Sequence, residues 1–280
     1  MQVYDLVIQN ASIVDGTGTP AFVGSVAIHQ GRVARVSPGS EPQINGRETL
    51  LAQGLVLCPG FIDVHAHDDF AVLEEPEVPW KVLQGVTTVV VGNCGIGAAP
   101  FPGAEDWFEK LHPGAERPTY SDYRGYFDAI DEASPSLNVA SLAGHGALRN
   151  AVAPGSRCAL GPHEARKLEG EVARALDAGV CGVSAGLIYE PGVFADESEL
   201  LGVLRVAKDA APLFAVHLRS EADELLSAVS EAIRICAQAG VGLQLSHHKA
   251  HGRNNWGKVK QSLSLVEAAR KSGLDVWLDQ

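Results

Sequence analysis

Short apolar runs alternate with helical patterns along most of the chain after Pro59. Each run spans only a few residues and is bounded by Gly, Asn, Pro or charged positions, as buried strands are. The runs predict seven strands, at 61–66, 86–92, 138–144, 180–186, 213–218, 242–247 and 274–278. Near-continuous apolar strands joined by helical crossovers predict a parallel sheet covered by helices.

Two of the segments between these strands have the period of an amphipathic helix. Leu168, Val172 and Leu176 share one face of a helix that we expect to end at Gly179. A second helix is predicted to begin at the capping box "SEAD", residues 220–223. The segment 97–137 breaks the alternation, and its proline, acidic and aromatic residues predict a lid or wall rather than part of the core.

Residues 1–58 have a different pattern, in which short alternating strands are separated by Gly, Pro and Asn. The stretch "SVAIHQGRVARV" predicts a hairpin with Gln30 and Gly31 at its turn. This first part is expected to be a portion of a small β-sandwich domain, because it is too short to form a stable sandwich alone.

Polar residues capable of chemistry recur where the predicted strands of residues 59–280 end. A barrel collects such residues at the carboxyl-terminal ends of its strands, so a barrel fits better than an open, doubly wound sheet. We therefore predict an α/β fold: an incomplete (β/α)8 TIM-type barrel at 59–280, with about seven of its eight strands, beside the β-domain portion at 1–58. Because the chain ends at or just after the seventh strand, we expect it to be truncated at its carboxyl terminus.

The charge balance narrows the range of partners. Across 280 residues, 22 basic and 34 acidic side chains give a formal net charge of −12. This charge argues against a nucleic acid or an anionic membrane as partner. A small anionic substrate is compatible with it where the site carries a metal or a lysine.

The amino-terminal residues show no export signal, and no apolar run is long enough for a membrane span. The five cysteines are an odd number without a C-x-x-C pair, which is typical of a reducing compartment. We expect a cytoplasmic protein.

Five residues at the ends of four predicted strands have side chains that bind zinc. They are His65, His67, Cys94, His217 and His247. Imidazole and thiolate favour zinc over magnesium or calcium. Each residue alone has an ordinary structural interpretation: a polar strand end, a small buried thiol or a structural histidine. Their shared position at strand ends favours a metal site.

Other polar residues leave alternatives open. His145, at the end of the third predicted strand, is a substrate contact or a loop anchor. Asp63, Asp68 and Asp69 are expected to be solvated loop carboxylates, with the orientation of a ligand histidine as the alternative.

Six stretches carry a resemblance to a known family. They are "PGFIDVHAHDD", "GVTTVVVGNCGIG", "GHGALR", "SAGLIYEPG", "HLRSEADELL" and "LSHHKAHG". Through them the chain resembles the N-acyl-D-amino-acid deacylases (D-aminoacylases) of the amidohydrolase superfamily. The H-x-H motif marks only the superfamily, whereas the "GNCG" cysteine and the "SHHK" block are more specific.

The resemblance implies a metal centre and a fold. Cys94, His217 and His247 would hold a tightly bound catalytic zinc, and His65 and His67 would form a weaker second position. The family's fold is a metal-dependent barrel beside a β-sandwich built from both chain ends. Its general base is an aspartate of the eighth strand, which would lie beyond residue 280, and Asp279 is not a substitute for it.

The implied reaction is hydrolysis of the amide bond of an N-acyl-D-amino acid. Lys249 would bind the substrate carboxylate, with an exposed loop lysine as the alternative. Tyr189 would line the pocket for the acyl group or side chain, with ordinary loop packing as the alternative. The stretch "CGVSAGLIYEPG" has no lysine, which disfavours a lysine-bridged cyclic-amide hydrolase. The alternatives are another amidohydrolase, acting on a different N-acyl or cyclic amide, and a non-catalytic metal-binding barrel if the chain truly ends at Gln280.

Overall fold

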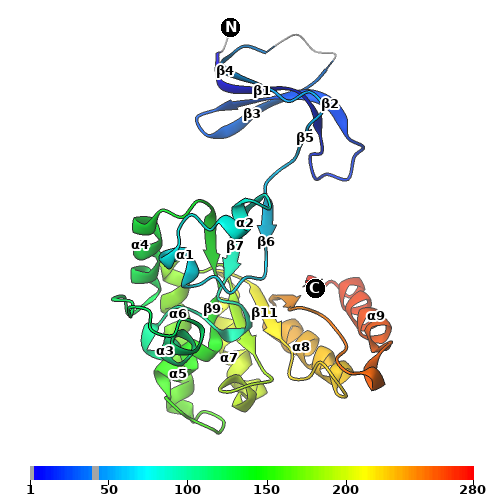
Figure 1. Cartoon of the computed structure of the whole chain (residues 1–280). Helices are drawn as coiled ribbons and strands as arrows, with labels where there is room; N and C mark the ends of the chain where they lie inside the picture. The colour runs from blue at the N-terminus through cyan, green and yellow to red at the C-terminus, as the bar shows by residue number, and fades with distance from the viewer. Residues whose placement is uncertain (1–2, 40–43) are drawn as a thin grey trace. The chain divides into compact units, whose positions relative to one another are not determined.

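The computed structural model describes residues 3–39 and 44–280 (Figure 1). The chain divides into two compact units, Met1–Phe61 and Ile62–Gln280. The boundary thus follows residue 61 rather than residue 58. Of the predicted first domain, residues 1, 2 and 40–43 lie outside the described residues.

The first unit contains a mixed sheet. Its strands are β1 (Tyr4–Ile13), β2 (Phe22–His29), β3 (Arg32–Pro38), β4 (Gly46–Leu51) and β5 (Val56–Leu57). The strand order is β3-β2-β1-β4, with β5 also pairing with β1. In this sheet β1–β2 and β2–β3 pair antiparallel, and β1–β4 and β1–β5 pair parallel. Two small apolar clusters form its core, one around Ala11 and Ile13 and the other around Val7 and Ala27.

The predicted hairpin is confirmed as β2 and β3, which pair antiparallel with His29 opposite Arg32. The two turn residues, Gln30 and Gly31, have φ of 52° and 71°. Positive φ at both central positions is what a two-residue type I′ turn requires, and glycine adopts it without a steric penalty.

The second unit is built on parallel strands. They are β6 (Phe61–Asp63), β7 (Val86–Val91), β8 (Asn138–Ser141), β9 (Ala143–Gly144), β10 (Val183–Gly186), β11 (Leu213–His217), β12 (Gly242–Leu245) and β13 (Val276–Leu278). One sheet has the order β6-β7-β8, and the other has the order β13-β12-β11-β10-β9. Each of the seven predicted strands coincides with an observed one, and the segment predicted at 138–144 contains both β8 and β9. Neighbours in space are thus neighbours in sequence.

Helices connect these strands and cover them (Figure 1). They are α1 (Ala71–Glu74), α2 (Pro79–Val82), α3 (Phe101–Leu111), α4 (Tyr123–Ala133), α5 (His145–Val152), α6 (Pro162–Ala178), α7 (Glu197–Ala207), α8 (Leu225–Ala239) and α9 (Lys258–Lys271). Three short 3₁₀ turns are η1 (Asn93–Gly95), η2 (Gly192–Phe194) and η3 (Arg253–Asn255). One large apolar core joins the inner faces of helices and strands.

The predicted buried face and carboxyl-terminal end of helix α6 are confirmed. Leu168 and Val172 are buried, Leu176 packs against the core, and Gly179 ends the helix with φ of 112°. The predicted start of the next helix is wrong, because α8 begins at Leu225 with Glu224 at its N-cap. Residues 220–223 ("SEAD") therefore lie before the helix and do not occupy its N-cap.

Residues 97–137 are predicted above to form a lid or wall rather than part of the core. This prediction is wrong, because the segment contributes to the main core. Helices α3 and α4 form there, and each buries one stripe of side chains in the main core. On α3 the stripe includes Phe101, Ala104 and Phe108, at the i, i+3, i+7 spacing of an amphipathic helix.

Among the residues that the structure describes, no helix has both the length and the apolar character needed to cross a membrane.

Candidate metal centre

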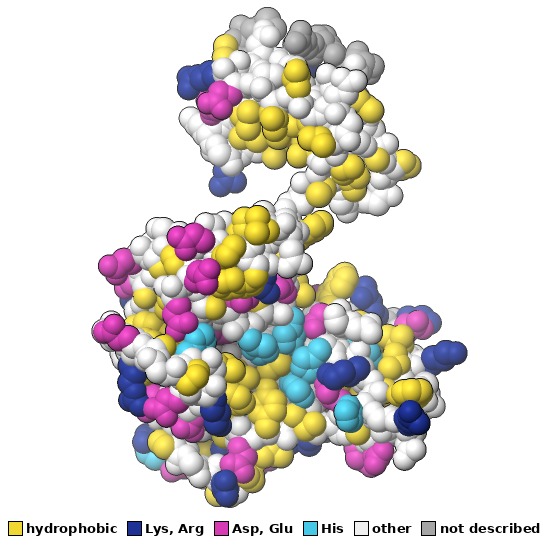
Figure 2. Space-filling model, viewed as in Figure 1, with side chains coloured by type: hydrophobic (Ala, Val, Ile, Leu, Met, Phe, Trp, Pro, Cys, Tyr) yellow, Lys and Arg dark blue, Asp and Glu magenta, His cyan; other side chains and the backbone are white. Residues whose placement is uncertain are grey.

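The five predicted ligands converge at one end of the parallel strands. Ligand atoms of His65, His67 and Cys94 lie within 4.8 Å of one another, and so do those of Cys94, His217 and His247. Cys94 belongs to both groups. Figure 2 shows histidine side chains, in cyan, gathered on one face of the second unit.

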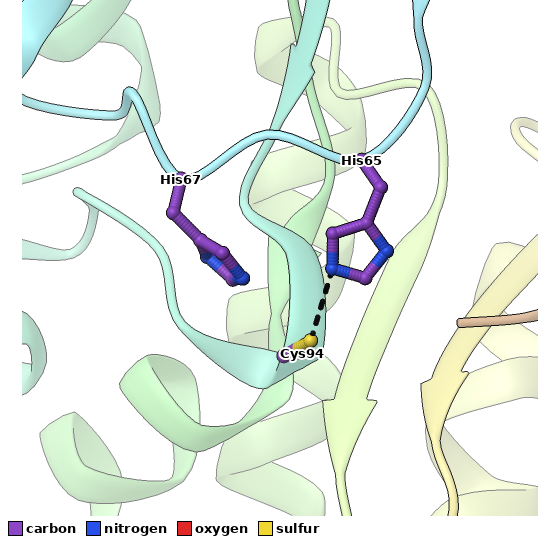
Figure 3. Close-up of side chains that lie close together, drawn as sticks. All are labelled: His65, His67 and Cys94. Atoms are coloured by element: carbon purple, nitrogen blue, oxygen red, sulfur yellow. Dashed lines mark hydrogen bonds between the residues drawn. The ribbon is translucent and has the colours of Figure 1, made fainter. Parts of the chain in front are cut away.

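The two histidines of the H-x-H motif reach the site from a loop. Strand β6 ends at Asp63, so both His65 and His67 follow it, whereas the predicted strand at 61–66 included His65. Their rings nevertheless both turn toward Cys94 (Figure 3), with His65 Nε2 3.3 Å from the sulfur. The loop therefore brings both imidazoles to the same thiol.

Cys94 lies in a tight turn directly after β7. Its φ is 57°, a left-handed conformation that is uncommon outside glycine. Tyr189 donates a 2.6 Å hydrogen bond to its carbonyl oxygen, and Ser184 accepts one of 2.9 Å from the next amide, that of Gly95. These contacts hold the strained turn in place, with the thiol 3% exposed and aimed at the histidines.

The spacing of donor atoms fits zinc. Two ligands on one tetrahedral zinc, a sulfur at about 2.3 Å and a nitrogen at about 2.0 Å, lie about 3.5 Å apart. The Cys94 sulfur is 3.3 Å from His65 Nε2 and 3.5 Å from His247 Nε2. Nε2 of His217 is buried without a hydrogen-bond partner among the described residues, as a nitrogen reserved for a metal would be.

The electrostatics of the cluster favour a thiolate among imidazoles. Burial opposes ionisation of Cys94, but hydrogen bonds with the surrounding histidines outweigh it and lower its pKa to about 3. Burial likewise opposes the charged form of His65, yet Asp279 and Cys94 raise its pKa to about 10. An anionic sulfur among nitrogen donors is the ligand set that a divalent borderline metal prefers.

Asp279, which follows β13, connects three of the strand ends. Its Oδ1 lies 3.1 Å from His65 Nδ1 and accepts a 2.6 Å hydrogen bond from the amide of His247. Its Oδ2 accepts one of 2.7 Å from Gln244. A carboxylate behind a ligand histidine fixes the ring and its tautomer.

Glu221, in the loop after β11, contacts a second candidate ligand, His247, as Asp279 contacts His65. Its Oε1 lies 2.8 Å from His247 Nδ1, 2.5 Å from Lys249 Nζ and 3.9 Å from His217 Nε2. Burial would raise the pKa of Glu221, but its hydrogen bonds with His247 and Lys249 lower it to about 2.

Comparison with known proteins connects this geometry to a family. Residues 50–273 match the model of the amidohydrolase family. The chain belongs to the amidohydrolase family.

Two curated relatives of this amidohydrolase come from Alcaligenes xylosoxydans xylosoxydans. An N-acyl-D-glutamate deacylase is 39% identical, with 98% of this chain and 56% of that protein covered. A D-aminoacylase is 33% identical, with 99% and 57% covered. The chain thus spans little more than half the length of these relatives.

A solved structure extends the likeness to three dimensions. The N-acyl-D-glutamate deacylase of Bordetella bronchiseptica, crystallised with zinc and a phosphonate inhibitor, superimposes with a TM-score of 0.89 at 38% identity. The match covers 99% of this chain and 58% of that one. The α/β fold of the amidohydrolase is therefore that of a deacylase structure, over the length of the present chain.

Tyr189 and Lys249 of this amidohydrolase lie beside the cluster of candidate ligands. The Tyr189 ring contacts that of His217, with centroids 5.2 Å apart, and also that of Trp107 at 5.8 Å. Because its hydroxyl is bound to the Cys94 carbonyl, the ring rather than the hydroxyl is available to a ligand. The Lys249 side chain is 45% exposed, next to His247 and Glu221.

His145 has other neighbours. It is 1% exposed, and its Nε2 lies 2.8 Å from Glu199, which also accepts a 2.9 Å hydrogen bond from the buried Arg149. The structure thus groups His145 with a buried ion network, whereas it groups the five predicted ligands with one another. A substrate contact at His145 stays a prediction.

Sequence reasoning missed two carboxylates of the site, and each had a signal. Glu221 lies four residues after His217 but was assigned to a capping box. Asp279 follows the last strand at the functional edge, where polar residues collect. Asp69, expected to be solvated, is instead 3% exposed, and this burial raises its pKa to about 7.

Proposed function

We propose that this amidohydrolase is a zinc-dependent hydrolase that cleaves the amide bond of N-acyl-D-amino acids, releasing a carboxylate and a free D-amino acid. The observation that carries the proposal is the meeting of Cys94 with four histidines, at distances that match zinc. It is supported by two relatives that are named for the removal of acyl groups from D-amino acids.

The ligand residues have distinct roles in this proposal. Cys94, His217 and His247 hold the tightly bound zinc, and His65 and His67 form a weaker second position. When bound, zinc lowers the pKa of a water molecule and polarises an acyl carbonyl. Asp279 keeps the His65 ring turned toward Cys94, and Tyr189 fixes the turn that presents the thiolate.

Lys249 supplies the positive charge for the substrate carboxylate. Its ammonium group lies 3.0 Å from Nδ1 of His247, so an anion bound to it would lie next to the metal ligands. This local charge explains how an anionic substrate is accommodated by a protein with a net charge of −12. The Tyr189 ring forms an apolar wall beside His217 for the acyl group or side chain.

We also infer that the parallel strands of the second unit belong to a (β/α)8 barrel, of which seven strands are present. Strand β6 is an end strand of one sheet, and β13 is an end strand of the other. Side chains that follow them nevertheless meet, since His65 Nδ1 lies 3.1 Å from Asp279 Oδ1. A sheet that curves until its first and last strands approach each other explains this contact.

A cytoplasmic location is part of the proposal. All five cysteines are free thiols, including the Cys94 that the metal requires. A reducing compartment keeps such thiols available.

Hydrolysis of matched N-acetyl-D- and N-acetyl-L-amino acids tests the function. The assay uses the complete protein, because the present chain spans 56% of its N-acyl-D-glutamate deacylase relative. We expect turnover of the D-series, its loss on zinc chelation and its return with added zinc. Turnover of only the L-series, or of a cyclic amide, would reject the proposal in favour of another amidohydrolase activity. Zinc binding without turnover of any amide would indicate a non-catalytic barrel.

A further inference from the structure

The Glu221 side chain lies between two proposed zinc ligands and the proposed substrate lysine. One oxygen, Oε1, is 2.8 Å from His247 Nδ1 and 2.5 Å from Lys249 Nζ. The side chain is only 13% exposed, whereas that of Lys249 is 45% exposed. A largely buried carboxylate needs polar partners. Of the two partners of Glu221, His247 is more buried than Lys249.

The main chain holds Glu221 in this position. Its carbonyl oxygen accepts a 2.7 Å hydrogen bond from the amide of His251, which ties the loop after β11 to the loop after β12. Two residues earlier, Arg219 forms an ion pair with Glu231 and donates hydrogen bonds to the carbonyl oxygens of Val193 and Ala195. The carboxylate is therefore presented from a braced loop.

The two nitrogens of His247 face different groups. Nε2 is 3.5 Å from the Cys94 sulfur, so it faces the ligand cluster, and Nδ1 faces Glu221 Oε1 at 2.8 Å and the Lys249 ammonium at 3.0 Å. The ammonium donates to Glu221 Oε1 and to the carbonyl oxygen of His247, so it has acceptors other than Nδ1. A neutral imidazole can bind a metal through Nε2 only when its proton is on Nδ1. A carboxylate that accepts this proton in a hydrogen bond selects that tautomer.

We propose that Glu221 is a positioning residue that fixes the metal-binding tautomer of His247 and aims the Lys249 ammonium from the same oxygen. This inference rests on the zinc site of the proposed function and not on its substrate. Glu221 touches neither zinc nor substrate, and it acts through the two side chains it holds. Binding of zinc and binding of a substrate carboxylate thereby depend on one shared acceptor.

The zinc affinity of two variants of nearly equal size tests the proposal. Glu221→Leu removes the acceptor, and Glu221→Gln removes the charge but keeps an oxygen that can accept from Nδ1. By competition with a chelator, without substrate, we expect Glu221→Leu to weaken zinc binding about 10–100-fold. Glu221→Gln should stay within about threefold of the unmodified protein, because a neutral acceptor still selects the tautomer.

Glu224→Leu is the matched control, since it removes a carboxylate from the same segment. Glu224 is exposed and accepts a hydrogen bond from Ser227, away from the cluster. It should leave the zinc affinity unchanged. Thermal unfolding of the zinc-free proteins verifies that each variant folds. If Glu221→Leu does not fold, the imidazole N–H proton of His247 in zinc-loaded protein replaces it as the readout: it should be protected from solvent exchange and shift in Glu221→Gln.

The outcomes separate this inference from the proposed function. Unchanged zinc affinity in Glu221→Leu would overturn the inference, and so would a loss in Glu221→Gln as large as in Glu221→Leu, because charge rather than tautomer would then be at work. An unprotected, unshifted N–H proton would also overturn it. A protein that binds zinc with the expected pattern of variants but hydrolyses no N-acyl-D-amino acid would support the inference and reject the function. Failure of the unmodified protein to bind zinc would overturn both.

Discussion

At the scale of the residue, Cys94 illustrates how a strained conformation is maintained for chemistry. A non-glycine residue in the left-handed region costs about 1–2 kcal/mol relative to a helical or extended one. Hydrogen bonds from Tyr189 to its carbonyl and from the Gly95 amide to Ser184 stabilise the turn. In this conformation the Cys94 sulfur lies 3.3 Å from His65 Nε2 and 3.5 Å from His247 Nε2.

We expect zinc binding to depend on the Cys94 thiol. Cys94→Ala should lose most of the bound zinc, because the side chain belongs to both groups of possible ligands and supplies their shared sulfur. Elemental analysis of purified protein measures the loss. Cys158→Ala is the control, since this exposed cysteine lies outside both groups, and it should retain zinc at the level of the unmodified protein. Full zinc content in Cys94→Ala would show that the thiol is structural.

The proposed ligands can be identified in the sequence, whereas the carboxylates next to them cannot. Cys94, His217 and His247 are chemically distinctive and occur at strand ends, so their type and position agree. Glu221 and Asp279 are acidic residues in a chain with 34 of them. What distinguishes Glu221 and Asp279 is that each lies within hydrogen-bonding distance of a histidine. This proximity arises only in the folded chain.

At the scale of the element, the turn after β7 depends on glycine for space as well as for conformation. Gly92 has φ of 76°, and a Cβ built on it would lie 2.2 Å from the carbonyl oxygen of Leu142. That oxygen belongs to the backbone between β8 and β9 and cannot move aside by a change of rotamer. The turn and the neighbouring strand are in contact with no room for a methyl group.

Gly92→Ala should therefore lower the free energy of unfolding by about 3 kcal/mol or more, from the backbone penalty and the overlap together. Gly155→Ala separates the two contributions, since Gly155 has φ of 67° and nothing within 4 Å of its built Cβ. It should cost about 1 kcal/mol. Urea denaturation of both variants measures the difference, and equal losses would mean that the steric overlap contributes nothing.

Helix α3 shows where sequence patterning was misread at this scale. A long excursion rich in proline and acidic residues resembled a lid, yet Phe101, Ala104 and Phe108 repeat at helical spacing. The helical period is present in the sequence, but the proline-rich and acidic composition of the segment obscures it. Aromatic contacts join this helix to the loop after β6, since the Phe108 and Phe70 rings lie 4.9 Å apart.

Phe108→Ala should lower the free energy of unfolding by about 3–5 kcal/mol, the usual cost of removing a buried aromatic ring. Leu111→Ala, on the same helix but 50% exposed, should cost less than about 1 kcal/mol. Chemical denaturation measures both. A small effect of Phe108→Ala would support the lid that the sequence first indicated.

At the scale of the whole molecule, the order of strands was predictable and their assembly around the site was not. Seven short apolar runs predict the parallel strands, because the strands of a parallel sheet covered by helices are apolar along most of their length. The boundary between the two units is less evident in the sequence than the strands are. It falls at residue 61, inside the apolar run that begins β6, where the composition does not change.

The metal centre should connect the second unit as a whole, since its proposed ligands follow four strands: β6, β7, β11 and β12. A ligand that binds only the folded state stabilises it by about 2.7 kcal/mol at 100 times its dissociation constant. For a protein of this size, 1 kcal/mol corresponds to about 2–4 °C in melting temperature.

Zinc removal by a chelator should therefore lower the melting temperature by about 5–10 °C, and added zinc should restore it. Magnesium should not, because thiolate and imidazole are poor ligands for it. Cys94→Ala should be nearly insensitive to the chelator; an equal decrease in that variant would place the stabilising metal elsewhere.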